Sequence, residues 1–385
     1  MSIVSRSRVR TFAAGLFVAT TCAVVPALAL QQRGAPPKTT AASKPKTAPT
    51  APWPDAKTME DRRRAAETRR LFRGTDPLEI TLTANFRSLN GDRDPNSTKI
   101  FLGTIEFAKE DGTHATVPVK LSGRGHARRQ ICSFQPIRIE FPKDQVKNTV
   151  FDGHGPLKLG THCRNEFEEF VLREYAAYRI YNLLTPRSFR ARLAKATYIE
   201  ASTKKPIGTR YAMFIEDDDD VAKRLEGRII DLKKLIFRQV EYETVTMMTI
   251  FEYMIGNTDM SMHEQHNVRL IQTQPGVRYT VPYDFDYAGI VDAPYAIPGK
   301  DLGLVTVRDR TYRGPCRTVE ELKPQFEKFR GIKADVMAIY ATLPGLTDKY
   351  RRSAQSYLEE FYKTLDRPAD VKKAFIDGCD GRPYM

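Results

Sequence analysis

The sequence contains few of the features that mark membrane proteins, zinc proteins and nucleic-acid binders. No apolar stretch beyond the first 29 residues approaches the roughly 20 residues that a membrane-spanning helix needs. The 5 cysteines form no Cys-x-x-Cys pair and the 6 histidines form no cluster, so zinc-ligand spacing is missing. The formal net charge of +14 is accompanied by no nucleic-acid motif. We therefore expect no membrane span and no nucleic-acid partner, and we interpret the charge as a solvated basic surface.

The first 29 residues have the composition of a secretory signal. Arg6, Arg8 and Arg10 form a basic beginning, residues 12–26 are mostly apolar and small, and residues 27–29 read Ala-Leu-Ala, a small-residue cleavage site. The sequence therefore predicts an exported chain that is periplasmic or extracellular.

Composition divides the remaining chain into three parts. Residues 30–56 are rich in Pro, Ala, Thr and Lys and predict a disordered linker. The rest is long for one compact core and favours two lobes. Alternating strand patterns dominate residues 57–216, which we expect to form a β-rich lobe with an antiparallel sheet. Residues 217–385 are mainly of helical period and predict a helical lobe that carries a catalytic loop and a hairpin.

The stretch around residues 255–289 organises the second lobe. Apolar residues recur at helical spacing over 237–254, and Gly256 with Asn257 is a typical helix end. Two short runs, 268–271 and 277–283, flank a Gln-Pro-Gly turn and predict a β-hairpin.

Polar residues gather at one end of this predicted hairpin. With a turn near Gln274, Asn267 lies about opposite Val281, and Asp284 and Asp286 follow shortly after. Carboxylate and amide oxygens are hard ligands of the kind that suit Mg²⁺ bound together with phosphates. Asp259 lies on the loop that leads into the same end, where a carboxylate can orient or deprotonate a hydroxyl nucleophile. The pattern indicates phosphoryl transfer.

These motifs, Gly256-Asn257-Thr258-Asp259, then Asn267, then Asp284-Phe285-Asp286, resemble the active-site signature of the CotH spore-coat kinase family. The resemblance implies an α+β, bilobal protein-kinase-like fold with a β-rich small lobe and a mainly helical large lobe. It implies that Asp259 is the catalytic residue, that Asn267 and Asp284 bind Mg²⁺, and that ATP is the phosphate donor. Asp286 is either a further metal ligand or a turn cap.

One departure from the family leaves a choice open. The segment from Asp259 to Asn267 is longer than the family's usual gap, so either Asn267 or Glu264 is the second metal group. We favour Asn267, because the strand that begins at Val268 follows it directly.

The resemblance also implies cations that bind the nucleotide phosphates. Arg124 lies in a Gly-rich basic loop, and two further candidates follow it, Arg138 on a predicted strand and Lys158 before the next helix. Glu216, at the end of the strand that connects the lobes, is expected to contact the adenine and ribose. One glutamate should orient the cation, and three on the helix over 165–184 remain open, namely Glu168, Glu169 and Glu174.

The predicted function is Mg²⁺-dependent phosphate transfer from a nucleoside triphosphate to a Ser/Thr-type hydroxyl of a protein substrate. A catalytically inactive kinase-fold binding or scaffold protein of the cell envelope is the alternative. A second alternative is a surface protein in which the carboxylates hold a structural Ca²⁺.

Four cysteines follow the predicted signal, and an even number in an exported chain indicates disulfides. Three pairings are possible. We predict Cys132 with Cys163 and Cys316 with Cys379, because this pairing keeps each bond within one lobe.

Overall fold

Seven strands of the N-terminal half form a closed barrel in the computed structural model, which describes residues 51–232 and 234–379. The strands are β1 (Leu78–Ala84), β2 (Phe101–Ala108), β3 (His114–Gly123), β4 (Ile137–Glu140), β5 (Leu157–Gly160), β6 (Ala191–Glu200) and β7 (Lys205–Ile215). Every second side chain of β1 points inward, so that Ile80, Leu82 and Ala84 are buried while their neighbours are not. The rings of Phe107 and Phe214 pack on Phe151 in the same interior core.

The closure of this barrel shows that the expected bilobal kinase-like fold is wrong. The strands follow the order β1-β2-β3-β4-β5-β7-β6, and β1 pairs in parallel with β6, from Leu78 beside Ala194 to Ala84 beside Glu200. The other barrel pairs are antiparallel, as predicted for this sheet. The parallel pair joins strands far apart in the sequence and leaves no local signal. Alternating burial also looks the same in an open sheet and in a barrel.

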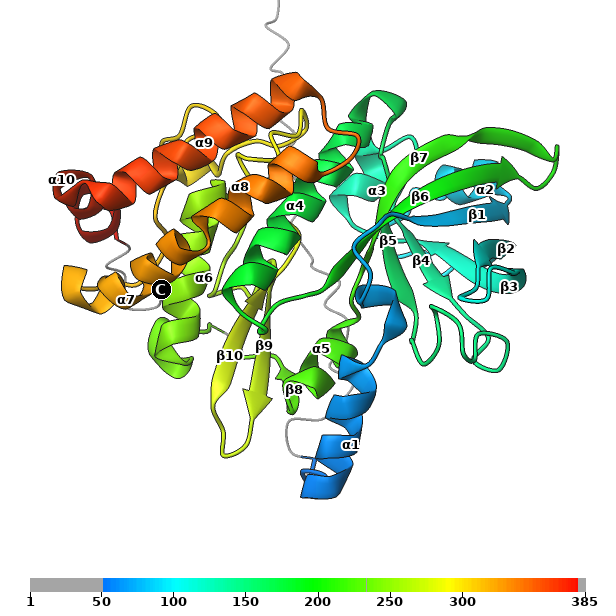
Figure 1. Ribbon diagram of the computed structural model, residues 1–385, viewed down its shortest axis with the longest axis horizontal. Coiled ribbons are helices and arrows are strands. Elements are labelled where there is room, and N and C mark those ends of the chain that lie inside the picture. The colour runs from blue at the N-terminus through cyan, green and yellow to red at the C-terminus, as the bar shows by residue number, and fades with distance from the viewer. Residues whose placement is uncertain (1–50, 233, 380–385) are drawn as a thin grey trace, which may run out of the picture. The chain divides into compact units, whose positions relative to one another are not determined.

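The α-helices of the described chain are α1 (Ala56–Glu67), α2 (Phe86–Gly91), α3 (Ala127–Ile131), α4 (Glu168–Leu184), α5 (Asp218–Arg224), α6 (Tyr242–Ile255), α7 (Val319–Gly331), α8 (Lys333–Thr342), α9 (Asp348–Asp366) and α10 (Pro368–Val371). Helices α6 to α10 lie to one side of the barrel, whereas α2 lies on the barrel away from them (Figure 1). The long helix α4 lies between the barrel and the C-terminal helices, and it is buried nearly all round. Its apolar residues share one core with Leu193 and Met213 of the barrel wall and with Phe251 of α6.

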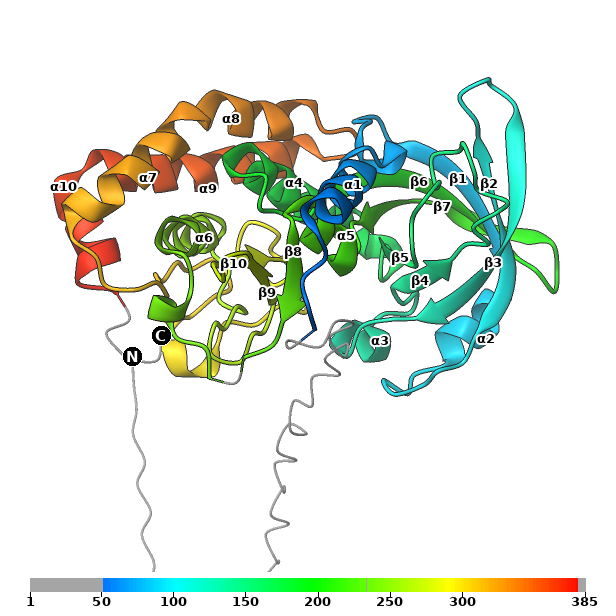
Figure 2. The same ribbon diagram turned by 90° about the horizontal axis from the view of Figure 1, so that it is seen from below.

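The predicted hairpin is confirmed. Strands β9 (Val268–Thr273) and β10 (Arg278–Pro282) pair antiparallel, and β8 (Gly227–Ile230) adds a third strand that the sequence analysis did not identify. Figure 2 shows this small sheet beside α5 and α6. Helix α6 ends at Gly256, which has a left-handed backbone (φ 68°), as a glycine at this position predicts.

Both predicted disulfides are confirmed, Cys132 with Cys163 and Cys316 with Cys379. They are compatible with the predicted export of the chain. No helix of the part of the chain that the structure describes is long and apolar enough to cross a membrane. The predicted signal at residues 1–29, and residues 30–50 of the predicted linker, lie outside the described residues.

Candidate functional site

The end of the β9–β10 hairpin brings Asp259 and Asn267 into contact. The Asn267 side-chain amide donates to Oδ2 of Asp259 at 3.0 Å and also to the Asp259 backbone carbonyl at 3.0 Å. Tyr283 donates its backbone N–H to the Asn267 carbonyl, so Asn267 lies opposite Tyr283 and directly beside Asp284. The register is two residues away from the one expected, in which Asn267 faced Val281, and it brings the polar residues closer together.

The longer segment between Asp259 and Asn267 folds into a small loop of its own. Ser261 and His266 form a two-way backbone bridge, with N–O distances of 3.1 and 2.9 Å. The bridge returns the chain to its starting point and sets Asn267 next to Asp259. Glu264 lies at the tip, where its side chain is 74% exposed and 2.7 Å from His263. Of the two alternatives for the second metal group, Asn267 is therefore the residue beside Asp259.

His266 belongs to this cluster, although the sequence analysis did not identify it. Its Nε2 lies 3.3 Å from Oδ2 of Asp259. The same carboxylate oxygen thus has two nitrogen partners, His266 and Asn267, and the described residues give Oδ1 none. The Asp259 side chain is 27% exposed. The signal for His266 was its position directly before Asn267.

Arg128 of α3 joins three carboxylates at the same place. Its guanidinium contacts Asp284 closely, lies 3.3 Å from Glu174 of α4 and lies 3.4 Å from Asp286. The Arg128 side chain is only 11% exposed. Glu174 is therefore the glutamate of α4 that faces the site, which the sequence had left open. Glu168 instead accepts from the Tyr211 backbone and Glu169 from Thr347.

Burial and neighbouring charges shift the pKa values of these three carboxyls in different directions. Burial raises the pKa of Glu174 to about 8, against the opposite effect of Arg128. Burial also raises the pKa of Asp286 to about 6, and the charges of Asp284 and Asp259 act in the same direction. Burial favours the neutral form of Asp284 as well, but Arg128 and Arg124 outweigh it and hold its pKa below the ordinary value. Of these three carboxyls, Asp284 is therefore the one whose ionised form the surrounding charges favour.

Asn267 and Asp284 both have left-handed backbones, with φ of 56° and 65°. Non-glycine residues rarely adopt this conformation, and it costs on the order of 1 kcal/mol or more at each position. Asp284 is held in place by Tyr178 of α4, whose hydroxyl accepts from the Asp284 backbone N–H at 2.9 Å. The paired strain at the two expected metal ligands is typical of functional sites.

Lys158 extends the site along the barrel wall. Its ammonium contacts Asp218 closely, and Arg269 of β9 binds the other oxygen of that carboxylate at 3.1 Å. Burial lowers the pKa of Lys158, and Asp218 opposes this effect. Asp217, directly before Asp218, caps the start of α5. The pairing of Asp218 with Lys158 was not predicted.

Arg138 and Arg124 are the two other cations that were predicted to bind the nucleotide phosphates. Arg138 is opposite Lys158 in the β4–β5 pair and is partly buried. Its side chain forms no ion pair or hydrogen bond with any residue that the structure describes. Nη1 of Arg124 is buried and likewise has no hydrogen-bond partner within the described chain. Buried donors without partners are costly unless something binds them, and a phosphate oxygen is a suitable acceptor.

Glu216, expected to contact the adenine and ribose, is engaged elsewhere. Its two oxygens accept from Arg224 at 3.1 and 3.0 Å, and one also accepts from the Arg190 backbone N–H at 2.9 Å. The Glu216 side chain is buried. Its carboxylate therefore fixes the segment that leads from β7 into α5, and its role toward a nucleotide stays a prediction.

The donor set suits Mg²⁺ only together with a phosphorylated ligand. Asp284, Asp286 and Asn267 offer hard oxygen donors, but nowhere in residues 51–232 and 234–379 do three or more His, Cys, Asp or Glu side chains gather so as to hold a metal ion alone. Mg²⁺ commonly takes one or two carboxylates and completes its shell with phosphates and water, so the chemistry fits. Arg128 is the competing cation, because it contacts both aspartates.

Comparison with known protein families found no match, and neither did comparison with curated proteins. Among solved structures, the chain is similar to the Helicobacter pylori proinflammatory kinase CtkA, with a TM-score of 0.36 and 10% sequence identity. The similarity covers 62% of this chain and 94% of that one. It is too weak to establish a shared fold, and membership of the CotH family stays a prediction.

Proposed function

We propose that the chain is an exported phosphotransferase that moves phosphate from a nucleoside triphosphate to a Ser/Thr-type hydroxyl of a protein. The observation that carries this proposal is the contact between Asp259 and Asn267 beside Asp284. A base, an amide oxygen and an ionised carboxylate are the three groups that phosphoryl transfer needs close together.

Each residue has a distinct part in the proposed reaction. Oδ1 of Asp259 accepts the proton of the acceptor hydroxyl, while His266 and Asn267 hold Oδ2 and fix the orientation of the carboxylate. Arg124 and Arg138 neutralise the phosphates of ATP. Mg²⁺ that arrives with ATP would be held by Asp284, Asn267 and Asp286, and it supplies charge stabilisation at the phosphate oxygens.

The alternative, an inactive nucleotide-binding or scaffold protein of the cell envelope, is favoured by a different observation. Arg128 already neutralises Asp284 and lies against Asp286, and Asp218 already neutralises Lys158. An arginine in this position stabilises the carboxylates without a metal. Catalysis and scaffolding therefore differ in whether Mg²⁺ with nucleotide can compete with Arg128 for Asp284.

Two substitutions test the proposal by calorimetric nucleotide binding and by phosphate transfer. Asp259→Asn keeps the side-chain volume but removes the base, so nucleotide affinity should stay nearly unchanged while transfer falls by roughly 10² to 10⁴. Asp284→Asn removes an ionised metal ligand, so it should weaken Mg²⁺-dependent nucleotide binding as well as transfer.

Glu264→Gln is the matched control, because it removes an exposed carboxylate of the same loop that does not reach Asp259. It should leave both measurements unchanged. The phosphotransferase proposal fails if the parent binds no Mg²⁺-nucleotide, or if Asp284→Asn binds it as tightly as the parent. Binding without transfer would favour the scaffold, and stabilisation by Ca²⁺ alone would favour a structural calcium site.

A further inference from the structure

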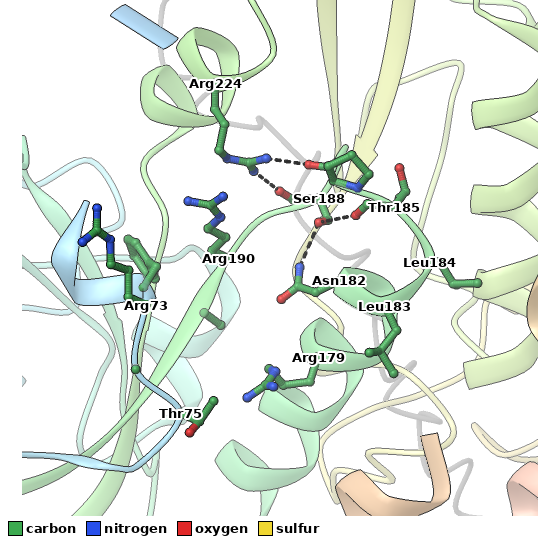
Figure 3. A pocket seen from close by; sticks show the side chains of 14 residues that line it. Arg73, Thr75, Arg179, Asn182, Leu183, Leu184, Thr185, Ser188, Arg190 and Arg224 are labelled. Carbon is green, nitrogen blue, oxygen red and sulfur yellow. Dashed lines mark hydrogen bonds between the residues drawn. The ribbon is translucent and has the colours of Figure 1, made fainter. Parts of the chain in front are cut away.

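A cavity of about 490 Å³ lies away from the candidate site, where the C-terminal end of α4 meets two connecting segments. The segments are residues 72–75, which lead into β1, and residues 185–191, which lead into β6. Figure 3 shows Arg73, Arg179 and Arg190 around the same opening. The volume lies in the range of small-molecule sites, roughly 300 to 1,000 Å³. No residue of the proposed active site lines this cavity.

The lining of the cavity is strongly cationic. Four arginines line it, Arg73, Arg179, Arg190 and Arg224, and no aspartate or glutamate does. Two of the four are already neutralised by carboxylates outside the lining, Arg190 by Glu67 and Arg224 by Glu216.

The other two arginines have no carboxylate within the described chain to neutralise them. Arg179 donates to the Tyr175 hydroxyl at 2.9 Å, and the Arg73 side chain forms no ion pair or hydrogen bond with a described residue. Two guanidinium charges therefore remain uncompensated at one cavity. Arg73 is exposed and Arg179 is half-buried, so both charges are available to an anion that enters the cavity.

A fifth arginine adds to this charge from just behind the wall. A side-chain carbon built on Gly74 would lie only 1.6 Å from Nη1 of Arg192, so the Arg192 guanidinium lies directly against the Gly74 backbone. The Nε of Arg192 is buried without a hydrogen-bond partner. Burial lowers the pKa of Arg192, Tyr175 and Asp76 oppose this, and the charge of Arg179 lowers it further. Asp76 is the acidic group that acts on Arg192, and it does not line the cavity.

Neutral polar groups complete the lining. Asn182 donates its amide N–H groups to Ser188 and to the Phe189 carbonyl, which leaves its Oδ1 as an acceptor toward the cavity. The exposed Thr75 hydroxyl is a second such group, because no described residue bonds to it. One acceptor and one hydroxyl beside the arginines are suited to the hydroxyl groups of a ligand.

We propose that this cavity binds a phosphorylated sugar or polyol with at least two phosphate groups. Arginine presents a planar fork that matches phosphate oxygens in pairs, and Arg73 with Arg179 supplies two uncompensated forks. The space exceeds what a single phosphate fills, and Asn182 and Thr75 take the hydroxyls of the carbon chain. This inference does not depend on the proposed phosphotransferase activity, since the two sites share no residue.

The experiment is isothermal calorimetry with the full chain at about 0.15 M salt, using fructose 1,6-bisphosphate, fructose and pyrophosphate as probes. We expect the bisphosphate to bind, fructose not to bind, and pyrophosphate to bind at least tenfold more weakly than the bisphosphate. The Arg73→Gln, Arg179→Gln double variant should weaken bisphosphate binding by at least 30-fold, on the order of two lost charge-assisted contacts. Arg73→Gln alone, at an exposed position, should weaken bisphosphate binding by about fivefold or more.

The matched control removes the same two charges elsewhere. Arg87 and Arg352 are exposed, and the Arg87→Gln, Arg352→Gln double variant should bind the bisphosphate as the parent does. If the control variant binds the bisphosphate as weakly as the Arg73→Gln, Arg179→Gln variant, the binding depends only on the overall positive charge of the protein, and the proposal is overturned. Absence of binding by the parent would overturn it as well. Pyrophosphate binding as tight as the bisphosphate would overturn the polyol assignment.

Discussion

Glu252 of α6 is a buried acid whose carboxylate oxygens have no hydrogen-bond partner among the described residues. Burial raises its pKa from 4.5 to about 8, while Asn257 and Arg313 act in the opposite direction and Asp259 adds to the rise. The folded state therefore binds a proton that the unfolded state releases, so the protein should lose stability as pH rises from about 4.5 through about 8.

Glu252→Gln should remove this pH dependence, because glutamine has a similar volume and stays neutral. Relative to the parent, the variant should gain on the order of 3 kcal/mol in free energy of unfolding between pH 5 and pH 8. Urea unfolding of both proteins at the two pH values measures the difference. Parallel pH profiles would show that Glu252 is ionised or paired in the folded chain.

At the residue scale, the sequence predicted the members of the hairpin cluster but not their partners. Asp259, Asn267 and Asp284 follow from chain spacing, since a turn brings the two ends of a hairpin together. Arg128 and Glu174 come from a loop and a helix far away in the sequence, and nothing in their local pattern separates them from solvated charges. Only tertiary packing selects Glu174 from the three glutamates of its helix.

At the scale of elements, Arg128 connects α3 with α4 and with the end of the hairpin. Arg128→Met should remove the cation that contacts Glu174, Asp284 and Asp286 and destabilise the protein by roughly 3 to 5 kcal/mol. A divalent cation can replace the guanidinium, so Mg²⁺ should raise the Tm of this variant more than that of the parent. Thermal unfolding with and without Mg²⁺ measures both effects.

Arg129→Met is the control for this prediction. Arg129 forms a buried ion pair with Asp92 at 2.6 Å, so its loss should also destabilise the protein. Because only one carboxylate remains there, Mg²⁺ should not restore stability. Equal restoration of both variants would mean that Mg²⁺ acts on the protein in general rather than at Asp284.

Helices that are marked by apolar periodicity and by stop residues in the sequence were predicted, whereas short elements without such marks were not. Helices α4 and α6 follow from apolar period and from stops such as Gly256. The short helix α2 was not predicted; its start is capped by Asn85, which accepts from the Ser88 N–H, and it ends at Gly91. A short helix and a turn share the same small polar residues, so the sequence does not separate them.

At the scale of the whole molecule, the two disulfides close loops of 31 and 63 residues. By loop-closure entropy each should stabilise the protein by roughly 4 kcal/mol. The Cys132→Ser, Cys163→Ser double variant should lose about this much in urea unfolding under oxidising conditions. Under reducing conditions the variant and the parent should have nearly the same stability, and a difference that persists would have to come from packing.

The parallel pairing of β1 with β6 also affects how the chain folds while it is being synthesised. The ribosome makes β1 first, and β1 can pair with β6 only after the chain has been extended from Leu78 to Ala194 and beyond. At translation rates of about 5 to 20 residues per second, one edge of β1 stays open for on the order of ten seconds. During that interval an apolar strand edge can pair with a strand of another chain. Yield should therefore depend on how quickly and in how dilute a state the chain is made, even where the finished protein is stable.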